Sequence, residues 1–108
     1  MRRMQVQGDI LFVPIKSVPK GLSPTQAQAG RHIFALGEVT GHSHSVAATK
    51  GLQVYRQGET TYCTIEELTG GVEVEHQEHG PITLDPGAWE IKRQVEWTDA
   101  NEPIYVGD

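Results

Sequence analysis

Short segments in which apolar and polar residues alternate cover much of this chain. Residues 72–76 read Val-Glu-Val-Glu-His, and residues 89–97 alternate in a similar way. Successive side chains of a β-strand point to opposite faces, so a period of two predicts half-buried strands. Other segments rich in strand-forming residues predict further strands at 5–15, 32–40, 44–48, 52–57, 60–68 and 81–84, and a short apolar patch follows at 104–106.

Turn-forming residues separate these segments. Gly58, the pair Gly70-Gly71 and the run Asp85-Pro86-Gly87 stand between expected strands, and each favours a tight reversal of the chain. No helical periodicity persists over two turns. About eight short strands, with a turn every eight to twelve residues, predict an all-β fold, either a small barrel or a sandwich.

The length of the chain, 108 residues, predicts one β domain over 1–108. Residues 16–31 contain several prolines and glycines and lack a strand pattern, which predicts a long loop. Loops of this length are uncommon in compact domains and are usually functional or mobile. We therefore expect the loop 16–31 to cover a binding site, and residues 98–108 to form a C-terminal tail.

The net charge of the chain and the length of its apolar runs argue against nucleic acids and membranes as partners. The formal net charge is −5, whereas nucleic-acid binding needs clustered Lys and Arg side chains. The apolar runs are too short to span a bilayer, and no signal-peptide pattern follows Arg2-Arg3. The one cysteine, Cys63, cannot form an intrachain disulfide, which suits a reducing compartment. We expect a soluble cytoplasmic protein that binds neither nucleic acid nor membrane.

Candidate chemistry is concentrated in two histidine pairs. His42 and His44 stand in Gly-His-Ser-His, and His76 and His79 stand in His-Gln-Glu-His-Gly. A His-x-His pair on a strand presents both imidazoles to one face. Neutral imidazole binds zinc, iron, nickel and related divalent ions. The four histidines therefore predict a site for a divalent transition metal (Zn, Fe, Ni or Mn), whose identity the pattern does not resolve.

The strand pattern also predicts where these rings point. Alternation places His42 and His44 on the same face as Phe34 and Val46, which is expected to face inward. His76 follows the apolar face of residues 72–76, whereas His79 precedes Gly80-Pro81, where the chain turns, and its direction stays open. Since the chain lacks a Cys-x-x-Cys pattern, a histidine and carboxylate set favours an open site that admits water or substrate.

Two charged residues are candidates for binding a ligand beside the metal. Glu38 lies on the expected face of His42 and could be a metal ligand or hold a ligating imidazole. Arg93 lies in an apolar stripe between Ile91 and Val95. Its stem could pack there while the guanidinium stays in water. Alternatively, Arg93 could point inward and either orient an anionic ligand or pair with a carboxylate such as Glu38.

Two sets of residues resemble the two motifs of the cupin superfamily. The first set is Gly37, His42, His44 and Gly51, and the second is Gly80, Pro86 and Gly87. The resemblance implies a jelly-roll β-barrel that holds a metal ion with histidines and a glutamate. Two of the usual cupin ligands have no counterpart here, so His76 or His79 would have to replace them, and the sequence leaves open which of the two completes the site. The same stretches also resemble small bacterial all-β proteins without an assigned activity.

Three functions are compatible with the sequence. The first is a small metal-binding β domain, whose site could act on a small-molecule ligand if it is catalytic. The second is a non-enzymatic assembly module, a homo-oligomer with the histidines at a subunit interface. The third is a metal-free polar cleft whose histidines titrate near neutral pH. The sequence leaves open whether the protein is an enzyme.

Overall fold

Antiparallel β-strands form the framework of the protein in a computed structural model, which describes residues 2–36, 42–97 and 103–105. The first six strands of this part are β1 (Gln5–Gln7), β2 (Ile10–Ile15), β3 (Arg31–Leu36), β4 (Ser43–Ala47), β5 (Leu52–Gln57) and β6 (Thr60–Ile65). A short 3-10 helix, η1 (Glu67–Thr69), precedes β7 (Val72–Glu75), β8 (Ile82–Leu84), β9 (Gly87–Arg93), β10 (Val95–Trp97) and β11 (Pro103–Tyr105). The prediction of an all-β fold is confirmed.

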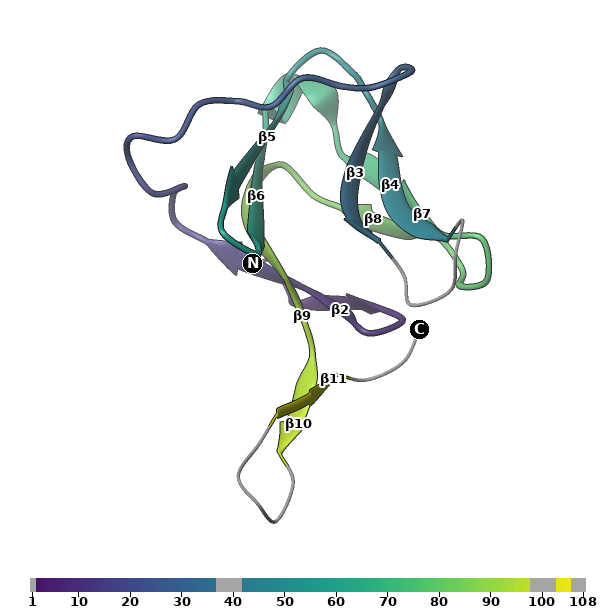
Figure 1. The fold of residues 1–108 in the computed structure, drawn as a ribbon. Coiled ribbons are helices and arrows are strands. Elements are labelled where there is room, and N and C mark those ends of the chain that lie inside the picture. The colour runs from purple at the N-terminus through teal and green to yellow at the C-terminus, as the bar shows by residue number, and fades with distance from the viewer. Residues whose placement is uncertain (1, 37–41, 98–102, 106–108) are drawn as a thin grey trace.

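The strands form two main sheets that face each other (Figure 1). One sheet has five strands in the order β1-β2-β9-β6-β5, and the other has four in the order β3-β4-β7-β8. The strand orders of the described part do not join into a closed barrel, so the architecture is sandwich-like. The hairpin of β10 and β11 extends away from the two sheets (Figure 1).

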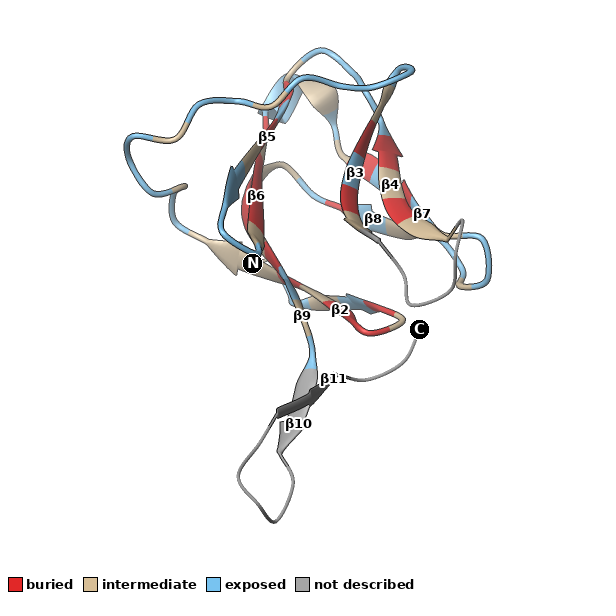
Figure 2. Ribbon diagram, in the orientation of Figure 1, coloured by how far each residue is buried: buried red, intermediate tan, exposed pale blue. Residues whose placement is uncertain are grey.

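The core lies between the two sheets, where the buried residues of their strands gather (Figure 2). Phe12 and Trp89 contribute the largest buried side chains of the five-stranded sheet, and Phe34 contributes that of the other. The rings of Phe12 and Phe34 meet edge to face with their centroids 6.0 Å apart. Burial of each such ring stabilises the fold by about 1.5–3 kcal/mol. The sheets are thus held face to face by apolar contact.

Some expected segments end earlier than the hydrophobic pattern suggests. The strand expected at 60–68 ends at Ile65 and is followed by η1. The alternating run 89–97 is divided at Gln94, whose backbone N–H donates to the carbonyl oxygen of Asp9 at 2.7 Å. In the segment expected as a tail, residues 103–105 pair with β10. The strand expected at 32–40 is observed to Leu36, and 37–41 lie outside the described residues.

The loop between β2 and β3 is fastened to the edge of β5. The backbone N–H of Thr25 donates to the carbonyl oxygen of Val54 at 2.7 Å, and its hydroxyl donates to the same oxygen at 3.2 Å. Gln28 and Arg31 exchange two backbone hydrogen bonds at the end of the loop. The loop therefore runs along the open side of the sandwich, where β5 and β3 are the edge strands of their sheets.

A two-residue turn at Gly8-Asp9 joins β1 to β2 and positions a carboxylate. Gln7 pairs with Ile10 across the turn, and Gly8 has a φ of 58°. A glycine with positive φ at the first turn position is typical of a tight hairpin whose twist matches its strands. The side chain of Asp9 is completely buried, so the turn places an acidic group inside the protein.

The described residues include no helix long and apolar enough to cross a membrane.

Candidate functional site

The structure brings the four predicted histidines together at one end of the four-stranded sheet. β4 pairs with β7 through Ser45–Glu75 and Val46–Val74, which places the start of β4 beside the segment that follows β7. The imidazole centroids lie 4.4 Å apart for His44–His76, 4.6 Å for His76–His79 and 5.5 Å for His42–His76. The rings of His44 and His79 are stacked, 6.4 Å apart and inclined by 8°. The cluster thus joins rings from two separate segments.

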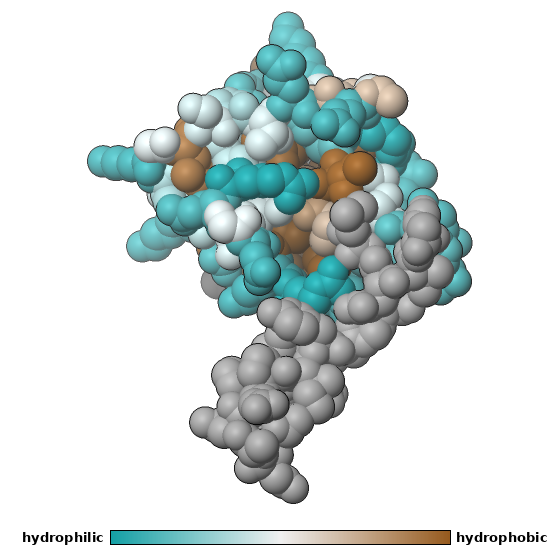
Figure 3. All heavy atoms as spheres, in the orientation of Figure 1, coloured by the Kyte–Doolittle hydropathy of each residue, from teal (hydrophilic) through white to brown (hydrophobic). Residues whose placement is uncertain are grey.

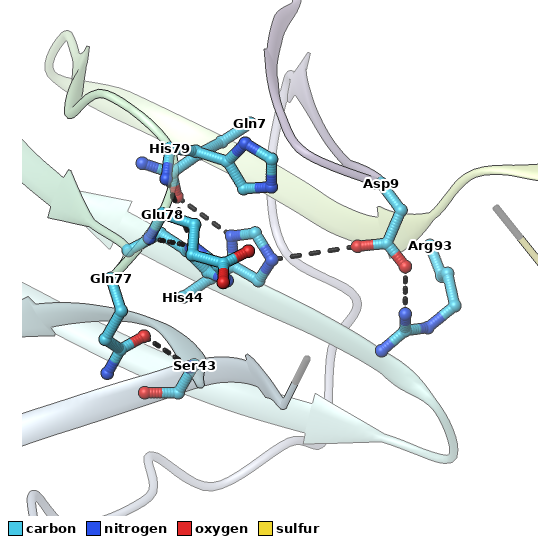
Figure 4. Close-up of polar contacts among 9 residues, drawn as sticks. Gln7, Asp9, Ser43, His44, Gln77, Glu78, His79 and Arg93 are labelled. Atoms are coloured by element: carbon cyan, nitrogen blue, oxygen red, sulfur yellow. Dashed lines mark hydrogen bonds and ion pairs between the residues drawn. The ribbon is translucent and has the colours of Figure 1, made fainter. Parts of the chain in front are cut away.

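His44 is the most deeply buried member of this histidine cluster, with an exposed fraction of 0%. Its Nδ1 atom lies 2.9 Å from the Oε1 atom of Gln7 (Figure 4). The amide of Gln7 is fixed in turn, because its Nε2 donates to the carbonyl oxygens of Val74 and Gly80 at 2.9 and 3.0 Å. The Oε1 atom of Gln7 must therefore accept the hydrogen bond from His44, which means that Nδ1 of His44 carries the proton. In the neutral ring, Nε2 then has the lone pair.

A buried ion pair lies beyond the Nε2 atom of His44. The Oδ1 atom of Asp9 is 3.7 Å from this nitrogen, and its Oδ2 atom is paired with the Arg93 guanidinium (Figure 4). Asp9 is completely buried, whereas the Arg93 side chain is 24% exposed. Arg93 therefore points inward and pairs with a carboxylate, as the second interpretation of the sequence had it. The carboxylate is Asp9, and the candidate Glu38 lies outside the described residues.

His76 closes the turn that carries His79. Its Nδ1 atom accepts hydrogen bonds from the backbone N–H groups of Glu78 and His79, at 3.0 and 3.3 Å. An accepting Nδ1 requires that the proton of the neutral ring be on Nε2. In this arrangement His76 orders the loop between β7 and β8. The ring would have to turn away from both amides before either nitrogen could bind a metal ion.

His42 lies at the edge of the cluster near solvent. Its Nδ1 atom is 3.7 Å from Oε1 of Glu78, with side-chain exposures of 19% and 54%. That nitrogen is buried and has no hydrogen-bond partner among the described residues. The backbone N–H of Ser43 donates to Oε1 of Gln77 at 2.9 Å and ties the two histidine segments together (Figure 4). Of the His42–Glu78 pair, the carboxylate of Glu78 is the more exposed group.

A shallow depression of about 220 Å³ lies beside the cluster, lined by Arg31, Ser43, Ser45, Glu75, His76 and Gln77. Over the described ranges, no three His, Cys, Asp or Glu side chains are already arranged around one point as metal ligands. Cys63 is fully buried on β6, and burial raises the pKa of its thiol to about 12. The thiol is therefore protonated at neutral pH and is unsuited to metal binding or nucleophilic attack.

Two residues of this site, Gln7 and Asp9, were not among the residues predicted from the sequence. Both belong to the β1–β2 hairpin, which packs against the histidine segments although it lies far from them in the sequence. The dipeptide Gly8-Asp9 is a turn signal. No sequence pattern, however, distinguishes a buried turn aspartate from an exposed one.

A family model described as "Domain of unknown function (DUF8820)" matches residues 6–94. The chain belongs to this family. The matched range contains the whole site of the DUF8820 domain, from Gln7 to Arg93. No curated protein and no solved structure matched the chain. The family description states no activity for the DUF8820 domain. The resemblance to cupins stays a prediction.

Proposed function

We propose that the histidine cluster binds one divalent transition-metal ion, with Nε2 of His44 as its innermost ligand. The observation that carries this proposal is the convergence of four imidazoles, one of which is the buried ring of His44, whose tautomer is fixed by Gln7. Histidine ligands commonly donate their other N–H to a protein acceptor, which fixes the tautomer and leaves the ligating nitrogen unprotonated. Gln7 supplies such an acceptor to His44.

The carboxylate of Asp9 supports the same placement. Its Oδ1 atom and Nε2 of His44 are 3.7 Å apart, and both are electron-pair donors when His44 is neutral. A cation between two such atoms stabilises both of them. Bonds of about 2.0–2.2 Å from one ion to each atom span this separation. Asp9 is therefore a further candidate ligand, and Arg93 holds it in position.

His42 and His79 complete the proposed ligand set. The described side chains are not already assembled as a metal site, so binding includes rotation of these two rings toward Nε2 of His44. Neither residue belongs to the fully buried core. His76 is assigned a supporting role, because its Nδ1 holds the turn before His79. This set of nitrogen and oxygen donors suits zinc, iron(II), nickel or manganese.

The choice of an intrachain site over a subunit interface follows from burial. His44 is completely enclosed within one chain, and its partners Gln7 and Asp9 belong to the same chain. A ring at a symmetry axis would instead be exposed in the monomer. The arrangement therefore favours a metal site within each chain over histidines that join separate chains.

The proposal is tested by metal analysis of untagged protein, since a polyhistidine tag would itself bind metal. We expect close to one equivalent of metal after loading, and loss of most of it in a variant with His42→Gln and His79→Gln. His32→Gln is the matched control, because His32 is the one histidine in the sequence outside the cluster. Less than about a tenth of an equivalent in the wild type would overturn the proposal, given the affinity expected of such sites.

A further inference from the structure

A second cavity lies on the open side of the sandwich and shares Arg31 with the depression beside the histidine cluster. It has a volume of about 360 Å³ and lies between the β2–β3 loop, β3 and β5. On the face seen in Figure 3, hydrophobic surface is visible between hydrophilic side chains, over the region where Figure 1 places β3, β5 and β6. The cavity is lined by Thr25, Gln26, Gln28, Arg31, His32, Ile33, Ala35 and Arg56.

The lining of this cavity is positively charged. It includes two guanidinium groups, an imidazole, two side-chain amides and a hydroxyl, and none of the described lining residues is acidic. Arg31 contacts Glu75 at 3.4 Å, but the pair is half exposed, and such surface pairs compensate charge weakly. A concave site that keeps positive charge in a chain of net charge −5 attracts anions selectively.

Arg56 is held at the cavity by neutral partners. One guanidinium nitrogen donates to Oγ1 of Thr61 at 3.1 Å, and the other donates to the carbonyl oxygen of Ile33. Thr61 in turn donates to the carbonyl oxygen of Phe34 at 3.2 Å. These bonds fix Arg56 between the two sheets, while no carboxylate among the described residues neutralises it. A cation fixed before binding loses little conformational entropy when an anion arrives.

His32 adds a neutral donor to the same wall. It is buried, and desolvation lowers the pKa of its imidazole. The ring is therefore neutral at pH 7 and offers one N–H group. An anion placed beside it would stabilise the imidazolium form. Anion binding at this cavity would thus be accompanied by proton uptake at His32.

We propose that this cavity, the β3–β5 cleft, binds a small molecule through a carboxylate or phosphate group. The guanidinium groups of Arg31 and Arg56 provide the planar, charge-assisted donors that such oxyanions accept. The amides of Gln26 and Gln28, on the loop fastened to β5, supply polar contacts for the rest of the ligand. The cavity volume falls within the range of small-molecule sites. This proposal is independent of the metal site.

The test is a titration of the metal-free, full-length protein with inorganic phosphate and, separately, with succinate, followed by ¹H–¹⁵N NMR at constant ionic strength. We expect saturable shifts confined to residues 25–35 and 53–57. Arg31→Gln and Arg56→Gln should each weaken binding about tenfold, the loss expected for one charge-assisted hydrogen bond. Lys20→Gln, at an exposed basic residue of the same loop, should leave binding unchanged. The stronger of the two probes identifies phosphate or carboxylate as the preferred group.

A second variant keeps the test decisive if Arg56→Gln does not fold, because Arg56 also bridges the sheets. Arg31→Gln with Gln28→Ala leaves that bridge in place and should still weaken binding. The proposal is wrong if neither anion binds below about 10 mM, an affinity too weak for a specific site. It is also wrong if Lys20→Gln weakens binding as much as Arg31→Gln, since the effect would then be nonspecific charge attraction.

Discussion

The side-chain amide of Gln7 lies 2.9 Å from Nδ1 of His44 and joins the two sheets of the sandwich at the histidine cluster. Gln7 ends β1 in the five-stranded sheet, whereas His44 lies on β4 in the other sheet. The same amide donates to the carbonyl oxygens of Val74 and Gly80. One buried side chain therefore fixes the tautomer of His44 and the ends of the loop that carries His76 and His79.

Replacement of Gln7 by Leu tests this role. The change removes the three hydrogen bonds that Gln7 makes with His44, Val74 and Gly80. Each buried polar group that loses its partner in this way lowers the free energy of unfolding by about 1–3 kcal/mol at most. We expect a clear loss of unfolding free energy in urea and a 10–100-fold weaker metal affinity, the usual effect of losing such a supporting contact. A variant that is destabilised yet binds metal with wild-type affinity would contradict the proposed role.

The ion pair of Asp9 and Arg93 should be strongly coupled. Arg93→Met removes the guanidinium from the buried carboxylate of Asp9, and removal of one partner of a buried pair costs about 3–5 kcal/mol. Adding Asp9→Asn also removes the buried negative charge, so the double variant should be more stable than Arg93→Met. Urea unfolding of the wild type, both single variants and the double variant measures the coupling. Additive effects would show that the pair contributes nothing specific.

Stability should depend on pH through His32. Burial lowers the pKa of its imidazole below the ordinary value of 6.5, so the unfolded chain takes up the proton first as the pH falls. Stability is therefore unaffected by His32 well above pH 6.5, and declines as the pH falls from 6.5 toward the folded-state value. Thermal unfolding at pH 7.5 and 5.5 should show a larger loss in the wild type than in His32→Gln. Equal losses would contradict the assignment.

The thiol of Cys63 should be unreactive in the native protein. Its thiol is buried and its pKa is raised to about 12, so very little thiolate is available to a disulfide reagent. Labelling should be slow in native buffer and rapid in denaturing urea. Cys63→Ala should bind metal as the wild type does. Fast native labelling, or loss of metal in Cys63→Ala, would show that the thiol belongs to a reactive site.

The hydrophobic pattern predicted the fold class because alternation directly reports which strand face is buried. Val72 and Val74 are buried while Glu73 and Glu75 are exposed, as their spacing indicates. The pattern failed at Gln94, where the alternating run 89–97 is divided. That break depends on a hydrogen bond to Asp9, a contact between distant segments that leaves no mark on local periodicity.

The histidines of the candidate site could be predicted from the sequence, whereas the residues that support them could not. The His-x-His spacing and the apolar face of β7 indicated that rings from two segments would meet. The contribution of Gln7 and Asp9 arises from packing of the β1–β2 hairpin against those segments. The sequence prediction assumes that polar residues are exposed, and these two polar residues are buried. The partner of Arg93 was missed for the same reason.

The most direct test of the metal proposal follows the imidazole nitrogens of His44 by long-range ¹H–¹⁵N NMR as one equivalent of zinc is added. We expect Nδ1 to stay protonated against Gln7 in both states, while the Nε2 resonance changes to that of a metal-bound nitrogen. The resonances of His42 and His79 should change with it, and those of His32 should not. Unchanged nitrogen resonances for His44 at saturating zinc would contradict the proposed site.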